Sequence, residues 1–300
     1  MRKNPKSFIA ICTIPPILLT IVFMLIPMAN AVYLSFTDST ALSVGLNSRF
    51  VFLENYKYML RDDDFILALI NTLKLMLIVP AVTVFFSLIL AFILTQGKLP
   101  EKKVYRTIFF FPSILSLTVV GIVWSFVFNP TKGILNHFLE LISLEQWKHS
   151  WLGESRTALW CIGVALIWQA VGYYMVMHVA AIDGISNDVY EAASIDGANS
   201  TQKFFKITIP LLRRSIGITY VLSLSGTINL SFTLSNVMTG GGPNGASSVL
   251  LQYMYTQGMR NANYGYAMSI AMFTLALAII LALISQKATE EKEADYGKAP

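Results

Sequence analysis

The hydrophobic residues of this 300-residue chain fall into long runs that are almost free of charge. Charged residues, glycines and prolines return between the runs. Six of the runs are long enough to cross a bilayer as a helix, which takes about 20 apolar residues. Helices are required there because an open strand edge leaves backbone groups unsatisfied in hydrocarbon. We expect the spans at residues 8–32, 73–95, 107–128, 158–182, 215–237 and 266–285.

This pattern predicts an all-α, polytopic membrane protein that forms a single transmembrane domain over residues 1–300. The basic residues Arg2, Lys3 and Lys6 before an apolar stretch resemble a signal peptide. However, the uncharged run from Ser7 to Thr37 is longer than the roughly 7–15 apolar residues of a cleavable signal. An uncleaved first span is the better interpretation.

Prolines occur inside three of the expected spans. A proline removes a backbone donor and kinks a helix, which neighbouring helices tolerate in a membrane bundle. We therefore expect bends in the first, second and third spans, at Pro15, Pro16, Pro27, Pro80 and Pro112.

Composition supports a lipid environment. Apolar residues make up 55% of the chain and charged residues 13%, whereas soluble domains carry about 25% charged residues. The net charge of +5 does not indicate a nucleic-acid partner, because the basic residues lie at the ends of apolar runs. Cys12 and Cys161 lie inside such runs, so we expect small buried hydrophobes rather than a disulfide or metal ligands.

The distribution of Lys and Arg predicts the orientation. With a cytoplasmic N-terminus, 14 basic residues fall on inner segments and seven on outer ones, and Lys74 lies at a span end. Cytoplasmic loops carry the excess of Lys and Arg, so both termini are expected inside. The inner set is Arg2, Lys3, Lys6, Lys98, Lys102, Lys103, Arg106, Lys203, Lys206, Arg213, Arg214, Lys287, Lys292 and Lys298.

The loop at residues 183–214, cytoplasmic by this charge count, carries local helix signals. Residues 188–195 read as a short helix, and Gly197 supplies a left-handed stop. A second helix can begin at Asn199, with Gln202 three residues later as a capping-box partner. Two short helices around one glycine form a protruding elbow. Its role from physics alone stays open between docking to a moving partner and anchoring at the membrane surface.

The same loop resembles the EAA signature of permease subunits in bacterial ABC importers. The sequence E-A-A-S-I-D-G-A is followed by F, K-I-T-I-P and L at the family's spacing. One departure is Ser186, where sugar-importer members often carry proline. The matching positions are Glu191, Ala192, Ala193, Asp196, Gly197, Ala198, Phe204, Ile207, Pro210 and Leu212.

The resemblance implies that this loop forms coupling helices that insert into a groove of a cytoplasmic ATPase. The chain itself is then a transport subunit without catalytic residues, cofactor or metal site. ATP and Mg²⁺ belong to the ATPase, and this sequence holds no G-x-x-x-x-G-K-[ST] phosphate loop.

Further segments resemble carbohydrate-importer permeases. Residues 53–72 and 105–136 are similar to the approach to their second span and to their third span. The sequence TGGGP, from Thr239 to Pro243, resembles a loop of the subunit type related to the larger maltose permease. The proportions match the six-span permeases of glycerol-3-phosphate and multiple-sugar importers. The resemblance implies a bacterial inner-membrane complex with a second, different permease, two ATPase subunits and an external solute-binding protein.

Sugar sites combine aromatic faces with polar groups. Within the spans, the residues of these types are Trp124, Trp168, Gln169, Tyr173, Tyr174, Asn229, Ser231 and Thr233. Each can instead be an interfacial aromatic or an interhelical hydrogen bonder. An alternative function is an ion-coupled secondary transporter of a small polar solute. That alternative requires ionisable residues deep in the spans, and we find no acidic or basic residue there.

Overall fold

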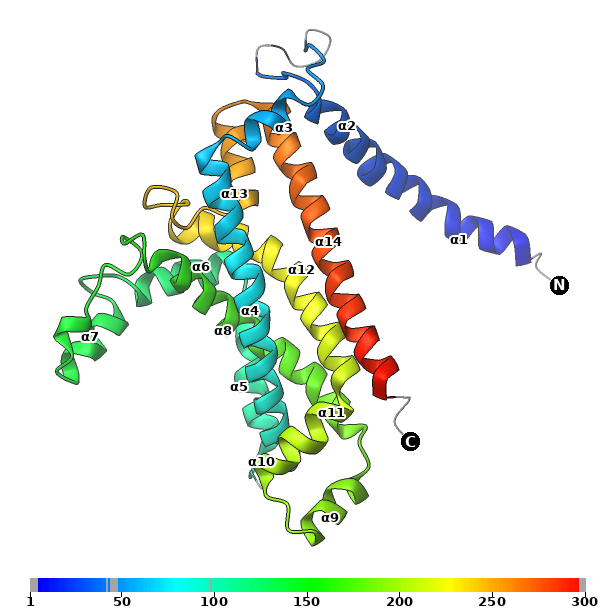
Figure 1. Ribbon diagram of the computed structural model, residues 1–300, viewed down its shortest axis with the longest axis vertical. Helices are drawn as coiled ribbons and strands as arrows, with labels where there is room; N and C mark the ends of the chain where they lie inside the picture. The colour runs from blue at the N-terminus through cyan, green and yellow to red at the C-terminus, as the bar shows by residue number, and fades with distance from the viewer. Residues whose placement is uncertain (1–4, 42, 44–47, 98, 297–300) are drawn as a thin grey trace. The chain divides into compact units, whose positions relative to one another are not determined.

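The computed structural model describes residues 5–41, 43, 48–97 and 99–296 (Figure 1), and within these ranges the regular structure is helical. The basic residues Arg2, Lys3, Lys98 and Lys298, used above to predict orientation, lie outside them. The α-helices are α1 (Pro5–Thr20), α2 (Ile26–Ser35), α3 (Glu54–Met59), α4 (Asp63–Gln96), α5 (Lys102–Ile114), α6 (Leu117–Val127), α7 (Ile134–Leu141), α8 (Ala158–Asp183), α9 (Asn187–Ile195), α10 (Ser200–Lys203), α11 (Ile209–Leu211), α12 (Arg213–Met238), α13 (Leu250–Tyr255) and α14 (Tyr264–Tyr296).

Five helical segments in the described chain are long and apolar enough to cross a membrane: Ile9–Ser35, Asp63–Gln96, Ala158–Asp183, Arg213–Met238 and Tyr264–Ser285. In the first, the π-helical turn η1 (Ile21–Leu25) joins α1 to α2. Helix α4 begins at Asp63, well before the apolar run expected from residue 73. The Asp62 carboxylate accepts hydrogen bonds from the backbone N–H groups of Asp64 and Phe65, which satisfies donors at this helix start.

The expected third span is not one continuous helix. The sequence predicts one continuous run at 107–128, but the structure divides it into α5 and α6, which meet at an angle of 100°. Leu115 and Ser116 between them are extended, with ψ angles of 142° and 136°. Pro112 lies in the last turn of α5, where its missing N–H weakens the helix. The Ser113 hydroxyl holds the bend by donating to the Gln169 carbonyl of α8 at 2.8 Å.

The chain forms two compact units. The first comprises residues up to Ile66 together with Met254–Leu275. Its polar core includes the Asn55 amide, which donates to the carbonyls of Ser35 and Thr37 at 2.9 and 2.8 Å. These bonds fix the end of the first helical segment against α3.

The second unit comprises Leu67–Tyr253 and the residues from Ala276 onward. One of its buried apolar clusters joins α4 and α8 to α6 and α12, and includes Leu75, Ile162 and Leu234. Helices α5 and α8 approach closely at Gly172, where an added Cβ would lie 1.9 Å from the Phe109 carbonyl oxygen. Figure 1 shows α9 beyond one end of α4 within this unit. This unit therefore contains the elbow and most of the helices to which it is attached.

Candidate functional site

The first half of the elbow is α9. The Ser186 hydroxyl accepts a hydrogen bond from the Asp188 backbone N–H and caps the N-terminus of the helix. Serine at the position where sugar-importer members often carry proline therefore still supports the start of α9. At the other end Gly197 has φ +79°, a conformation that costs an L-residue about 1–2 kcal/mol. The Ala198 N–H then bonds the Ala193 carbonyl at 2.8 Å. Glycine at this position allows the chain to reverse immediately after the helix.

The second half begins with the capping box predicted from the sequence. The Asn199 side chain accepts from the Gln202 N–H, and the Gln202 side chain accepts from the Asn199 N–H, both at 2.8 Å. Helix α10 continues through a π-helical turn, η3 (Phe204–Thr208), and α11 before α12 begins. The elbow is thus built from two locally capped helical segments that share Gly197 as their turn.

Three buried aromatic and aliphatic side chains attach the elbow to the spanning helices: Tyr190, Phe204 and Leu212. They belong to an apolar cluster with Phe92 of α4 and Val179 of α8. The Phe92 and Phe204 rings meet edge to face, with centroids 5.2 Å apart. The elbow is therefore closely packed against α4 and α8.

A buried hydrogen bond closes the elbow on itself. The Tyr190 hydroxyl pairs with the Thr208 hydroxyl at 2.9 Å, and both side chains are buried. Burial raises the pKa of Tyr190 above its ordinary value of 10.0. The sequence reading missed both residues, because their pairing depends on how α9 folds back against η3.

The signature residues of the elbow differ in how far they are exposed. Glu191, Ala192, Asp196 and Gly197 are exposed, as is Pro210, whereas Ala193 and Ala198 are partly buried. Ile195 is 87% exposed, the most accessible large apolar side chain in the described chain. It lies one helical turn after Glu191 and Ala192, so helical spacing alone places it on the same face of α9 as these two residues. Ile195 could therefore have been predicted as part of the exposed tip, although it was not among the expected residues.

Three of the expected pathway residues come together on α8. Gln169, Tyr173 and Tyr174 line a pocket of about 190 Å³, together with Ser113, Ala170 and Leu230. The Tyr173 and Tyr174 rings meet edge to face at 5.2 Å. The pocket adjoins the break between α5 and α6, and Ser113 lines it from the end of α5. Ser113 was not among the residues predicted from the sequence.

The other expected pathway residues lie elsewhere. Trp124 and Trp168 contact each other with ring centroids 5.7 Å apart, and Trp124 lines a different, apolar cavity. On α12, Ser231 is buried and its hydroxyl bonds the Ile228 carbonyl of its own helix. Asn229 is exposed and Thr233 is partly buried on the same helix. None of these five is among the residues that line the α8 pocket.

No group of three His, Cys, Asp or Glu side chains within the described ranges could hold a metal ion. His178, the one histidine within an expected span, is fully buried, and its Nε2 lies 3.4 Å from the Thr219 hydroxyl. It packs between α8 and α12.

Comparison with known proteins assigns the chain to a class. A family model described as "Binding-protein-dependent transport system inner membrane component" matches residues 84–292. The chain belongs to this family, so it is a multi-pass permease subunit of an inner-membrane importer and not an enzyme. The break between α5 and α6 and the whole elbow lie within the matched region.

Two curated relatives cover nearly the whole chain. The probable ABC transporter permease protein YurN of Bacillus subtilis is 34% identical and covers 95% of this chain and 97% of its own length. The diacetylchitobiose uptake system permease protein NgcF of Streptomyces coelicolor is 30% identical and covers 90% of this chain and 78% of its own. The names of both relatives describe permease proteins.

A solved structure has the same fold. It is the crystal structure of a bacterial alginate ABC transporter in complex with an alginate pentasaccharide-bound periplasmic protein. The matched chain superposes with a TM-score of 0.79 at 21% identity, covering 94% of this chain and 93% of that one. At this identity the likeness establishes the fold alone.

Proposed function

We propose that this chain forms half of the translocation pathway of an ATP-driven importer for a carbohydrate, meaning a sugar, an oligosaccharide or a polyol derivative. Family membership and the names of the relatives, one a diacetylchitobiose permease, support this substrate class. The observation that carries the mechanism is the elbow, with an exposed acidic and apolar tip on a buried aromatic base.

In the proposed mechanism, the elbow lies in the cytoplasm, as do both termini, and its tip docks into a groove of an ATPase subunit. The charge count and the signature residues Glu191 to Gly197 support this placement. ATP binding moves the docked tip, and the cluster around Phe204 transmits that movement to α4 and α8. ATP and Mg²⁺ are bound by the ATPase, and this chain binds no cofactor of its own.

The substrate passes the pocket formed by Gln169, Tyr173 and Tyr174. Aromatic rings offer flat apolar faces for the C–H surfaces of a sugar, and the Gln169 amide offers both a donor and an acceptor for hydroxyl groups. The pocket adjoins the bend after α5, so movement of α8 relative to α5 changes its shape. Ser113, at that bend, is the additional residue we assign to it.

The proposed assembly contains a second, different permease, two ATPase subunits and an external solute-binding protein. The TGGGP loop supports a heterodimer of permeases, because the companion subunit type usually lacks that loop. An alternative is an ion-coupled transporter of a small polar solute. Uptake into proteoliposomes distinguishes the two: we expect dependence on enclosed ATP and insensitivity to ionophores, and the reverse result would favour ion coupling.

The docking role is tested by Gly197→Val in the assembled importer, with Gly184→Val as the matched control. Valine is strained at the positive φ of Gly197, whereas Gly184 has φ −79° and room for a side chain. We expect Gly197→Val to lose carbohydrate uptake while remaining in the membrane, and the control to retain uptake. Normal import by Gly197→Val would show that the docking assignment is wrong.

The division of labour has its own test. The purified chain, without its partners, is expected to hydrolyse no ATP. ATP hydrolysis should appear only when the ATPase subunits are added. ATPase activity from the chain alone would contradict the proposal.

A further inference from the structure

Helix α7 presents a row of exposed apolar side chains outside the spanning helices. Ile134, Phe138 and Leu141 are 70%, 54% and 70% exposed, and their spacing of four and three residues places them on one face. A contiguous apolar face on a surface helix marks an interaction site.

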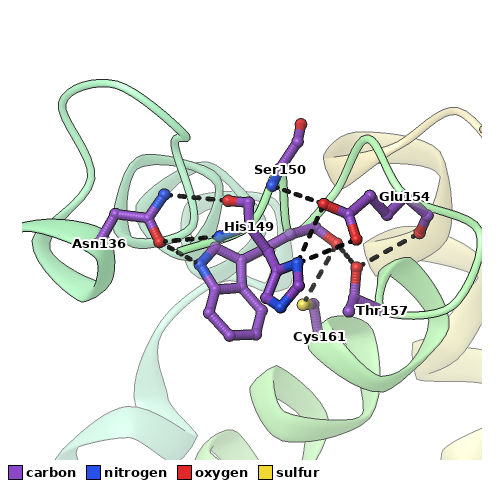
Figure 2. Close-up of polar contacts among 7 residues, drawn as sticks. Asn136, His149, Ser150, Glu154, Thr157 and Cys161 are labelled. Carbon is purple, nitrogen blue, oxygen red and sulfur yellow. Dashed lines mark hydrogen bonds and ion pairs between the residues drawn. The ribbon is translucent and has the colours of Figure 1, made fainter. Parts of the chain in front are cut away.

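The orientation of this face is fixed by a buried asparagine (Figure 2). The Asn136 amide nitrogen donates to the His149 carbonyl at 2.9 Å. It also donates to the Pro130 carbonyl at 2.9 Å. Its oxygen accepts from the Trp151 indole N–H at 2.7 Å. Asn136 is buried and lies on the opposite side of α7 from Ile134 and Phe138. The hydrogen bonds of Asn136 therefore fix the side of α7 opposite the apolar face.

A second set of contacts connects residues 149–151, which Asn136 holds, to the residues just before α8 (Figure 2). The Glu154 carboxylate accepts from the Ser150 N–H at 2.9 Å and lies 3.2 Å from His149 Nδ1. The Thr157 hydroxyl donates to the Trp151 carbonyl. Because Asn136 of α7 bonds His149 and Trp151, these contacts connect α7 to the residues just before α8.

Beneath the apolar face is a cavity of about 580 Å³ between α6, α7 and α8. Ile134 and Phe138 line it from α7, and Trp160 and Val164 line it from α8. Trp160 and Val164 are exposed on α8, a helix that is long and apolar enough to span a membrane. The apolar face of α7 thus continues the exposed apolar surface of α8 without a polar interruption between these four residues.

The remaining exposed side of α7 suits water. His137 and Glu140 are exposed there, and Glu140 forms an ion pair with Lys148 at 3.0 Å. Trp147, beside Lys148, is also exposed. Tryptophan and lysine are typical of the boundary between hydrocarbon and water, where one end of each side chain is apolar and the other polar.

We propose that α7 is an interfacial helix that lies in the membrane surface, with its Ile134, Phe138 and Leu141 face in lipid and a phospholipid acyl chain in the cavity beneath. An acyl chain suits the cavity because it is apolar and enters from the lipid around α8, whereas water would find few partners there. A lipid surface also explains why the polar and apolar sides of one short helix are both exposed. The inference requires only that the chain spans a membrane and does not depend on the transported substrate.

The test measures the surroundings of single nitroxide labels on the assembled importer in lipid nanodiscs. Cys12 and Cys161 are first replaced by alanine, and labels are placed by Phe138→Cys and, as the matched control on the same helix, His137→Cys. Oxygen collects in hydrocarbon, whereas a nickel chelate stays in water. We expect the label at 138 to collide several-fold more with oxygen relative to the chelate than the label at 137.

Two outcomes would overturn the proposal. Equal chelate access at 138 and 137 would mean that the helix stands in water. Protection of 138 from both reagents would mean that another subunit covers the face. If Phe138→Cys does not assemble, Ile134→Cys probes the same face, and Val164→Cys reports whether the cavity itself contains lipid.

Discussion

The side-chain amide of Asn71 donates a hydrogen bond to the backbone carbonyl of Ser248 at 3.0 Å, across 177 residues of sequence. The same nitrogen lies within 3.3 Å of the Gly245 carbonyl and 3.1 Å of the Ala246 carbonyl. Next to it, the Thr72 hydroxyl accepts from the Leu250 N–H at 2.9 Å. Two adjacent residues of α4 thus hold the turn that follows the TGGGP sequence and the first turn of α13.

We expect Asn71→Asp to destabilise this turn, because a carboxylate facing several carbonyl oxygens replaces a buried donor with an acceptor. Leaving buried polar groups unsatisfied costs about 1–3 kcal/mol. The midpoint of thermal unfolding in detergent should fall, and proteolysis within residues 239–249 should increase. Asn261→Asp is the control, since Asn261 is exposed, lies outside the spanning segments and bonds Gln257, four residues away, at 3.1 Å. Equal losses in the two variants would count against the role assigned to Asn71.

Gly172 is predicted to tolerate no side chain. A Cβ there would meet the Phe109 carbonyl oxygen at 1.9 Å and its carbon at 2.6 Å, and backbone atoms cannot move aside as a flexible side chain can. Gly172→Ala should therefore separate α5 from α8 and abolish assembly, measured by size-exclusion chromatography of the complex.

The matched control is Gly163→Ala, on the same helix and also buried. Its Cβ would meet Leu75 Cδ2 at 3.4 Å, an ordinary contact. Alanine also favours a helix over glycine by about 1 kcal/mol, so this variant should be neutral or more stable. A wild-type elution profile for Gly172→Ala would refute the close approach of α5 and α8.

The Tyr190–Thr208 bond is predicted to hold the elbow rigid enough to transmit force. Tyr190→Phe and Thr208→Val should each lower the unfolding midpoint, and a double-mutant cycle should give a coupling of about 0.5–1.5 kcal/mol. Carbohydrate uptake should fall in both single variants while membrane insertion persists. Ser200→Ala serves as the comparison, because Ser200 is exposed at the first position of α10. Additive effects of the two substitutions would mean that the hydroxyls do not interact.

The Glu140–Lys148 pair should make the α7 segment sensitive to pH. A hydrogen bond from Lys148, together with its positive charge, holds the pKa of Glu140 below its ordinary value of 4.5. A carboxyl with a lower pKa when folded contributes stability above the unfolded pKa, and loses that contribution as the pH falls through the folded value. Glu140 is exposed and Lys148 is only partly buried, so the effect is small and weakened by salt.

We expect a nitroxide at His137→Cys to become more mobile as the pH falls below 4.5. Glu140→Gln should show the higher mobility already at neutral pH, with little further change on acidification. A pH response of the same size in both variants would assign it to another group.

Local sequence patterns determined the parts of this protein that depend on neighbouring residues. Long apolar runs determined that the chain is helical and spans a membrane, because hydrocarbon leaves the backbone no other way to satisfy its polar groups over such lengths. The elbow at Gly197 and the capping box of Asn199 and Gln202 were equally predictable. Both depend on residues within one helical turn, and both are present in the structure.

Tertiary structure decided the features that depend on distant partners. The 100° break after α5 is held by Ser113 against Gln169, 56 residues away, so Pro112 alone indicated weakness but not a division. Packing between helices also placed Gln169, Tyr173 and Tyr174 around a shared pocket, which Trp124 and Ser231 do not line. Helical periodicity says which residues share a face, whereas packing between helices decides what that face meets. The orientation of the exposed apolar face of α7 was likewise decided by tertiary structure, because it depends on the buried hydrogen bonds of Asn136.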